Sequence, residues 1–156
     1  MSTPDPLPDR PRLALLLRRA WYGLNQTFRR RIAGTGLTPD QFTILRWLTE
    51  HPEGLTQRAL ADLMASDPNT VTAILTRMLN AGLIERRADP DDARCNRILL
   101  KAKGRTLHSR LQPLASGLQD DLLAAIPAAQ RDSFLANLVL LAESLEQRER
   151  DARAKR

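Results

Sequence analysis

The sequence predicts a mainly α-helical protein with one small β-hairpin, on three observations. Apolar residues recur every three or four positions over several long stretches, which is the period of amphipathic helices. Capping residues stand where three of these stretches begin. Two short apolar runs, at residues 83–87 and 97–100, flank a polar segment rich in Asp, and this pattern is typical of a hairpin with a long tip.

The first two predicted helices are separated by glycines. The first runs from Arg12 to about Ala33 and ends at residues 34–36, because glycine tolerates the left-handed conformation that follows many helices. The second begins at Thr38, a capping residue, with Pro39 at the first helical position and Gln41 completing a capping box. We expect its inward residues to be Phe42, Leu45 and Leu48.

Two further helices follow, and the first of them is short. After one brief strand at Leu55, Thr56 caps a helix over residues 57–65, with inward residues expected at Leu60, Leu63 and Met64. Asp67 then caps a helix that ends at Gly82. Its buried stripe is predicted to contain Val71, Ile74, Leu75, Met78 and Leu79.

The remaining chain is predicted to form the hairpin and two long helices. A helical region runs beyond Lys103 to Ile126, and Pro113 is expected to kink or split it, because proline removes a backbone donor and clashes with the preceding turn. Pro127 is expected to start the last helix. Its apolar face would contain Phe134, Leu135, Leu138, Leu141, Ala142 and Leu145.

Length and composition indicate one domain with extensions. Of 156 residues, 42% are hydrophobic, which is enough for a core. Residues 1–11, with four prolines, are interpreted as a disordered arm, residues 12–148 as one domain, and residues 149–156 as a frayed, charged tail. Within the domain, residues 38–102 would form one lobe, flanked by helices over 12–33 and 103–148. No apolar run is long enough to span a membrane, so we expect a soluble, cytoplasmic protein.

A short helix followed by a polar-faced helix is the helix-turn-helix arrangement, and a hairpin directly behind it is a wing. The net charge of +6 favours partners rich in phosphate. Between Asp67 and Gly82 the sequence contains no acid that would repel a phosphate backbone. We therefore predict that this helix enters the major groove of DNA, with Arg77 near the backbone and base contacts from Asn69, Thr70, Thr72, Ala73 and Thr76.

The wing is rich in arginine, which suits a narrow and strongly negative minor groove. Arg86, Arg87, Arg94 and Arg97 all lie on it. Asp92 is close enough to orient the Arg94 guanidinium through a charge-assisted bond, whereas Asp89 and Asp91 are interpreted as ordinary turn residues. The alternative reading of the polar helix, as a merely solvated surface, stays open at this point.

The run "LTPDQFTIL … GLTQRALADLM … NTVTAILTRMLNAGLIERRADPDDAR … KGRTL" resembles the MarR family of winged-helix transcriptional regulators in order and spacing over residues 12–148. The resemblance implies an obligate homodimer held by the first and last two helices, a pseudo-palindromic operator, and often a small aromatic or phenolic effector. It places Asp92 and Arg94 on the family's wing motif. It also places Gln57 and Arg58 at the backbone-contacting start of the third helix.

The sequence departs from the family pattern at four positions, which puts the operator and the effector pocket in doubt. Ala73 stands where the family often has Arg, and Thr76 replaces a frequent Asp. Lys101 occupies a usual Thr capping position, and Pro113 is unusual within its helix. The dimer has independent support, because the long leucine stripes of the terminal helices exceed what one small lobe can cover. A compact monomer with these helices folded back is the alternative.

Several single residues have more than one interpretation. Trp21, Tyr22, Trp47 and His108 are the candidates for an effector cavity, whereas Phe28 and Phe42 are interpreted as core. Cys95 lies among arginines whose charge favours the thiolate, so a peroxide sensor competes with an incidental small residue. His51, Cys95 and His108 match no zinc spacing, and no metal or cofactor is expected. No nucleophile with a paired base, phosphate loop or facing carboxylate pair indicates an enzyme.

These observations predict a ligand-responsive, homodimeric repressor that binds double-stranded DNA. Two alternatives come from other classes of function. A winged-helix module could use its polar helix to hold a protein partner, or the chain could bind DNA architecturally, without sequence preference.

Overall fold

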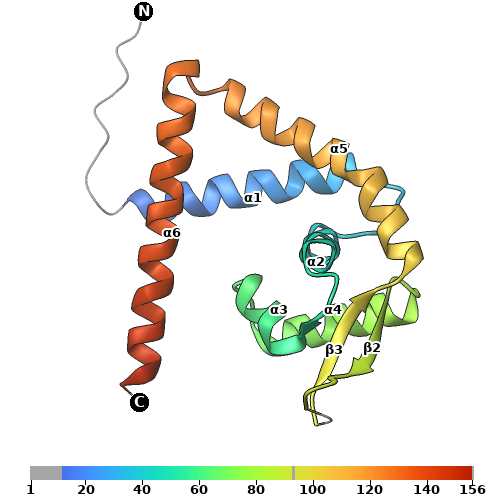
Figure 1. The fold of residues 1–156 in the computed structure, drawn as a ribbon. Helices are drawn as coiled ribbons and strands as arrows, with labels where there is room; N and C mark the ends of the chain where they lie inside the picture. The colour runs from blue at the N-terminus through green and yellow to red at the C-terminus, as the bar shows by residue number, and fades with distance from the viewer. Residues whose placement is uncertain (1–11, 93, 156) are drawn as a thin grey trace, which may run out of the picture. The chain divides into compact units, whose positions relative to one another are not determined.

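The structure is a computed structural model that describes residues 12–92 and 94–155, so the arm predicted over residues 1–11 lies outside the described residues. The architecture is mainly α-helical with one small antiparallel sheet, which confirms the predicted fold class (Figure 1). The elements are α1 Leu13–Arg31, α2 Pro39–Glu50, β1 Leu55–Thr56, α3 Gln57–Leu63, α4 Pro68–Asn80, β2 Ile84–Ala88, β3 Asn96–Leu100, α5 Ala102–Ala124, the 3-10 turn η2 Ala128–Gln130 and α6 Arg131–Ala154.

The chain divides into two compact units between Ala115 and Ser116. The first contains α1 to α4, the sheet and the start of α5, and the second contains the rest of α5, η2 and α6. None of the described helices is both long and apolar enough to cross a membrane.

Three expectations for the C-terminal helices need correction. Of the kink or split expected at Pro113, the split does not occur, because α5 is one continuous helix through that residue. The last helix begins at Arg131 rather than at Pro127, because Pro127 caps a 3-10 turn in which the Gln130 N–H donates to the Pro127 carbonyl at 2.8 Å. The charged segment expected to fray remains helical as far as Ala154.

The capping hydrogen bonds predicted at the starts of α2 and α3 are present in the structure. Thr38 and Gln41 form the capping box: the Thr38 hydroxyl oxygen accepts from the Gln41 N–H at 3.3 Å, and the Gln41 side chain accepts from the Thr38 N–H at 2.9 Å. Thr56 caps α3 by accepting from the Ala59 N–H at 3.1 Å. These bonds satisfy amides that a helix leaves free at its start, which fixes where α2 and α3 begin.

The core lies between α2, α3, α4 and the sheet, whose strands run in the order β1-β3-β2. Ile98 of the middle strand is 1% exposed and pairs in register with Leu55 on one side and Arg86 on the other. The α3 assignment needs one correction: Leu63, expected inside, is 39% exposed, whereas Ala61 is buried. The buried face of this short helix is therefore centred on Leu60 and Ala61, and Leu63 lies outside it.

An aromatic cluster joins α1, α2 and α5. The Phe28 and Phe42 rings meet edge to face with centroids 5.0 Å apart, and Phe42 stacks on His108 at 5.3 Å. His108 is 9% exposed, and its buried Nε2 has no hydrogen-bond partner among the described residues. Burial lowers the pKa of His108 below its usual value, and the nearby Arg46 guanidinium lowers it further, whereas Glu50 acts in the opposite direction.

We expect Gly104→Ala to destabilise the fold by about 1–3 kcal/mol, as overpacked sites do. A Cβ at this position would lie 2.4 Å from the Leu83 carbonyl oxygen and 2.7 Å from a Leu100 methyl. Gly23→Ala is the matched control, because its added Cβ would meet nothing within 4 Å and alanine favours a helix. Denaturant unfolding measures both. Equal stabilities of the two variants would contradict the close packing of α5 on the sheet.

The buried His108 predicts a stability that depends on pH. Because its pKa is lowered in the folded state, the unfolded chain binds the proton more readily, so stability is full above about pH 6.5 and falls as the pH decreases below it. His108→Phe keeps a ring against Phe42 and removes the titration. We expect its unfolding free energy to change less between pH 7 and pH 5 than that of the parent chain. A parental slope in His108→Phe would refute the assignment.

Candidate nucleic-acid interface

The outer face of α4 is polar and free of acidic side chains. Asn69, Thr70, Thr72, Ala73, Thr76 and Arg77 are all exposed, while the opposite face packs in the core as predicted. Asp67, the acid at its start, caps the helix. One carboxylate oxygen accepts from the N–H groups of Asn69 at 2.9 Å and Thr70 at 3.2 Å. The negative charge of Asp67 therefore interacts with backbone amides at the positive end of the helix dipole.

Two of the threonine hydroxyls of α4 donate hydrogen bonds within the helix. The Thr72 hydroxyl donates to the Pro68 carbonyl at 2.8 Å, and the Thr76 hydroxyl donates to the Thr72 carbonyl at 2.9 Å. The Gln57 side-chain amide, from α3, donates to the Thr72 oxygen. Because the hydroxyl hydrogens of Thr72 and Thr76 are engaged within the helix, these two side chains offer an incoming molecule oxygen lone pairs and methyl groups.

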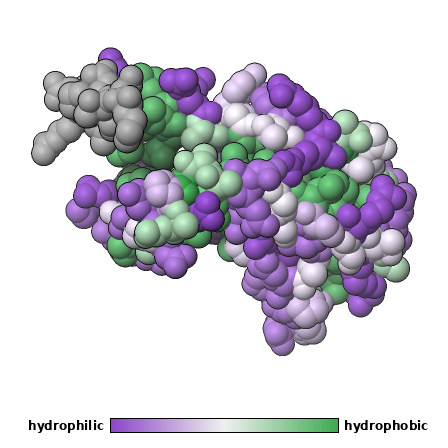
Figure 2. All heavy atoms as spheres, turned by 90° about the horizontal axis from the view of Figure 1, so that it is seen from above, coloured by the Kyte–Doolittle hydropathy of each residue, from purple (hydrophilic) through white to green (hydrophobic). Residues whose placement is uncertain are grey.

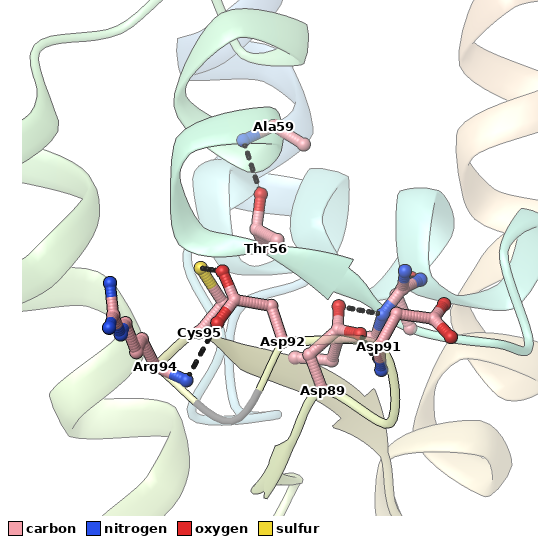
Figure 3. A network of polar contacts seen from close by, with 9 residues as sticks. Thr56, Ala59, Asp89, Asp91, Asp92, Arg94 and Cys95 are labelled. Atoms are coloured by element: carbon pink, nitrogen blue, oxygen red, sulfur yellow. Dashed lines mark hydrogen bonds and ion pairs between the residues drawn. The ribbon is translucent and has the colours of Figure 1, made fainter.

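The wing tip is ordered by Asp92, but not in the way expected. Its carboxylate accepts from the backbone N–H of Arg94 at 3.0 Å and lies 3.6 Å from the Cys95 sulfur (Figure 3). The predicted bond to the Arg94 guanidinium is therefore replaced by a bond to its backbone. Asp92 shapes the turn, and the exposed Arg94 side chain extends from it.

The environment of the Cys95 thiol disfavours its ionised form. The thiol is exposed, and its pKa is raised because it donates to the Asp92 carboxylate, whose charge also opposes ionisation. The thiolate form that neighbouring arginines would favour is therefore opposed by the Asp92 carboxylate. The described residues contain no group of three side chains that could hold a metal ion.

The wing stem contains an ion pair that sequence reasoning missed. Arg97 of β3 donates through Nε to the Asp89 carboxylate at 2.6 Å, and through Nη1 to the Gly54 carbonyl at 3.3 Å. Asp89 also accepts from the Asp91 N–H, so turn chemistry describes only half of its role. The Arg97 and Asp91 bonds both hold the pKa of Asp89 below its usual value, the Asp91 bond most strongly.

Strand parity is the signal that could have revealed this pair. Glu85, Arg87 and Asp89 alternate onto one face of the hairpin, and Arg97 stands directly opposite Arg87 in the register. Two arginines placed opposite each other repel, so each needs an acid. Arg87 pairs with Glu85, which leaves Asp89 for Arg97.

The other predicted interface residues lie on the same two elements or beside them. Arg58 is exposed at the start of α3, next to the half-buried Gln57. Arg86 is exposed on β2, on the strand face opposite to that of Arg87. The outer face of α4, the start of α3 and the wing therefore all present cationic or polar groups.

The four candidate effector residues have different environments. Trp21 and Tyr22 are 62% and 66% exposed on α1. Trp47 is half-buried against the core, with its ring 6.2 Å from that of His51. His108 lies in the aromatic cluster with Phe28 and Phe42, which are buried as expected. The ring contacts thus join His108 to the residues interpreted as core.

Comparison with known proteins identifies relatives of this architecture. Residues 37–96 match the family model described as MarR family. The transcriptional regulator HosA of Escherichia coli is 27% identical over 125 residues, which are 77% of this chain and 92% of HosA.

Two solved structures have the same fold. The transcriptional repressor CouR, named from Rhodococcus jostii and bound to a 23-mer DNA duplex, is 29% identical with a TM-score of 0.75, covering 83% of this chain and 92% of CouR. BpsR of Bordetella bronchiseptica, whose DNA binding is regulated by 6-hydroxynicotinic acid, has a TM-score of 0.78 at 24% identity, covering 88% and 98%.

Proposed function

We propose that the chain is a member of the MarR family of transcriptional regulators, and that it acts as a homodimeric, cytoplasmic repressor that binds a specific duplex sequence. The observation that carries the proposal is the acid-free outer face of α4 beside an arginine-bearing wing. Regulation rather than catalysis is its role. Residues 38–102 form the DNA-binding lobe, and residues 12–33 and 103–148 form the dimerisation region.

Each element has a distinct part in the proposed complex. The α4 helices of two protomers occupy major grooves one helical turn apart, about 34–36 Å, and the wings reach the flanking minor grooves. We assign base contacts to Asn69, Thr70, Thr72, Ala73 and Thr76, backbone contacts to Gln57, Arg58 and Arg77, and wing contacts to Arg86 and Arg94. Asp92 holds the wing tip in shape.

The direction of the threonine hydrogen bonds limits which base groups α4 can bind. Since the Thr72 and Thr76 hydroxyls donate within the helix, they favour base groups that donate to oxygen or contact a methyl. The amino groups of adenine and cytosine and the methyl group of thymine fit this description. Ala73 adds a second small apolar surface suited to thymine.

The dimer is supported by the apolar surface of the terminal helices. Large apolar side chains remain exposed on both α1 and α6, and apolar areas are visible on the face drawn in Figure 2. A soluble chain rarely leaves so many uncovered unless they form an interface. On α6 the exposed residues include Phe134, Leu135, Leu138, Val139, Leu140 and Leu145.

We propose further that a small aromatic or phenolic ligand releases the DNA. The regulation of BpsR by 6-hydroxynicotinic acid supports this class of effector, as does the buried, unpartnered Nε2 of His108 beside aromatic rings. Such a ligand switches affinity only if it binds the two conformations of the protein unequally. Titrating small aromatic acids and phenols into the protein–DNA complex tests their ability to dissociate it.

Specificity distinguishes this function from its two alternatives. The probe is a duplex that the protein itself selects from a random-sequence library. A specific regulator should bind it at least about a thousandfold more tightly than unrelated duplex of equal length. Equal affinities would favour architectural binding, and failure to bind any duplex would favour the protein-interaction module.

We expect Arg94→Ala to weaken binding to the selected duplex and to reduce the slope of log affinity against log salt concentration by about one unit, because one phosphate-neutralising charge is lost. Arg46→Ala is the matched control, since this cation lies on α2 and is paired with Glu50. Its salt slope should equal that of the parent chain. Identical slopes in all three proteins would argue against insertion of the wing tip into DNA.

We expect Leu138→Glu to shift the protein from dimer to monomer, because the new charge would have to be buried in the apolar interface. Gln147→Glu adds the same charge at an exposed position on the opposite side of α6, beyond these apolar residues, and should leave the dimer intact. Sedimentation over a range of concentrations measures both. A dimer of unchanged affinity in Leu138→Glu would exclude this face of α6 from the interface.

A further inference from the structure

Arg97 lies in the middle of the sheet, and its side chain donates hydrogen bonds to other groups of the protein. It belongs to the middle strand, where it pairs in register with Thr56 of β1 and Arg87 of β2. Its side chain is 30% exposed, and the Asp89 side chain that accepts from it is 8% exposed. A partly desolvated, charge-assisted bond of this kind is far more constrained than a pair in open solvent.

The two contacts of Arg97 join segments that are distant in the sequence. Asp89 directly follows β2, where the hairpin leaves the sheet, and Gly54 directly precedes β1. One guanidinium therefore ties the base of the wing to the turn that enters β1. We call Asp89, Arg97 and the Gly54 carbonyl the wing brace.

Gly54 permits this close approach. Its φ of +84° lies in the left-handed region, and a Cβ there would be 2.8 Å from the Ile98 carbonyl oxygen and 3.3 Å from the Arg97 Cβ. Only a residue without a side chain leaves room for the turn to lie against β3. The carbonyl that accepts from Arg97 is thereby brought within reach.

A short series of hydrogen bonds leads from the wing brace to α4. β1 ends at Thr56, which caps α3 through the Ala59 N–H (Figure 3). The next residue, Gln57, donates to Thr72 on the outer face of α4. The wing base and the outer face of α4 are thus connected through the two bonds of Arg97, the two-residue strand β1, the Thr56 cap and the bond from Gln57 to Thr72.

We propose that Asp89 and Arg97 are positioning residues, which hold the wing at a fixed angle to α4 so that the two elements meet adjacent grooves together. Arg97 then acts through the wing rather than by binding phosphate itself. The inference rests on the proposed DNA-binding function. It adds to that function a role for Asp89, whose negative charge increases the affinity for DNA because it holds Arg97.

The sign of one substitution separates this proposal from simple electrostatics. Asp89→Asn keeps the side-chain shape and a carbonyl oxygen for the Asp91 N–H, but removes a negative charge beside the wing. If Arg97 binds DNA, the variant should bind more tightly. If the brace positions the wing, affinity for the selected duplex should fall by about fivefold to thirtyfold, while affinity for unrelated duplex remains unchanged or rises.

Arg97→Lys supplies the second test, because lysine keeps the charge but cannot make the two directed bonds. The brace predicts a loss similar to that of Asp89→Asn, and a double variant no weaker than either single one. Direct DNA contact predicts only a small loss of affinity from Arg97→Lys, which should add to the gain from Asp89→Asn in the double variant. Hydroxyl-radical footprints should show weaker protection at the outer minor grooves, with the central major-groove contacts retained.

Glu85→Gln is the matched control, since it removes an equal charge from the Arg87 pair on the same strand face without touching β1. It should bind the selected duplex no more weakly than the parent chain. All variants are compared below their unfolding transitions. Weakened binding in Arg94→Ala together with unchanged or tighter binding in Asp89→Asn would overturn the brace alone, whereas no effect in Arg94→Ala would count against the DNA-binding wing itself.

Discussion

The middle strand of the sheet is the element on which the rest of the structure depends. β3 pairs with β1 on one side and β2 on the other, and its alternation sends Ile98 into the core and Arg97 to the opposite face. The same strand therefore joins the packing under α4 to the polar contacts of the wing. A shift of one residue would exchange these two side chains and place a guanidinium in the hydrophobic core.

The recognition helix satisfies two demands with one sequence. Its inner stripe, which includes Val71 and Leu75, is fully buried, so the helix is held rigidly by packing. On its outer face the hydroxyls of Thr72 and Thr76 already donate within the helix, so few rotamers of these two side chains remain to be fixed when a partner binds. Such a surface is preorganised, which reduces the entropic cost of recognition.

Local chemistry was predictable from the sequence, and long-range pairing was not. The caps at Thr38, Thr56 and Asp67 and the buried stripe of α4 depend on residues within one or two turns, and they are present as expected. The role of Asp89 depends on which side chains face each other across two strands and on a turn 35 residues earlier. The exposure of Leu63 depends likewise on how a seven-residue helix rotates against its neighbours.

The lone thiol gives the wing a built-in attachment point. Cys95 is the single cysteine of the chain, lies at the surface, and sits next to the turn that Asp92 organises. A maleimide dye can therefore be attached at one defined place without altering the coding sequence. Because the neighbouring carboxylate disfavours the thiolate, labelling should proceed faster in mildly alkaline buffer. Fluorescence anisotropy of that dye would then follow wing motion in real time.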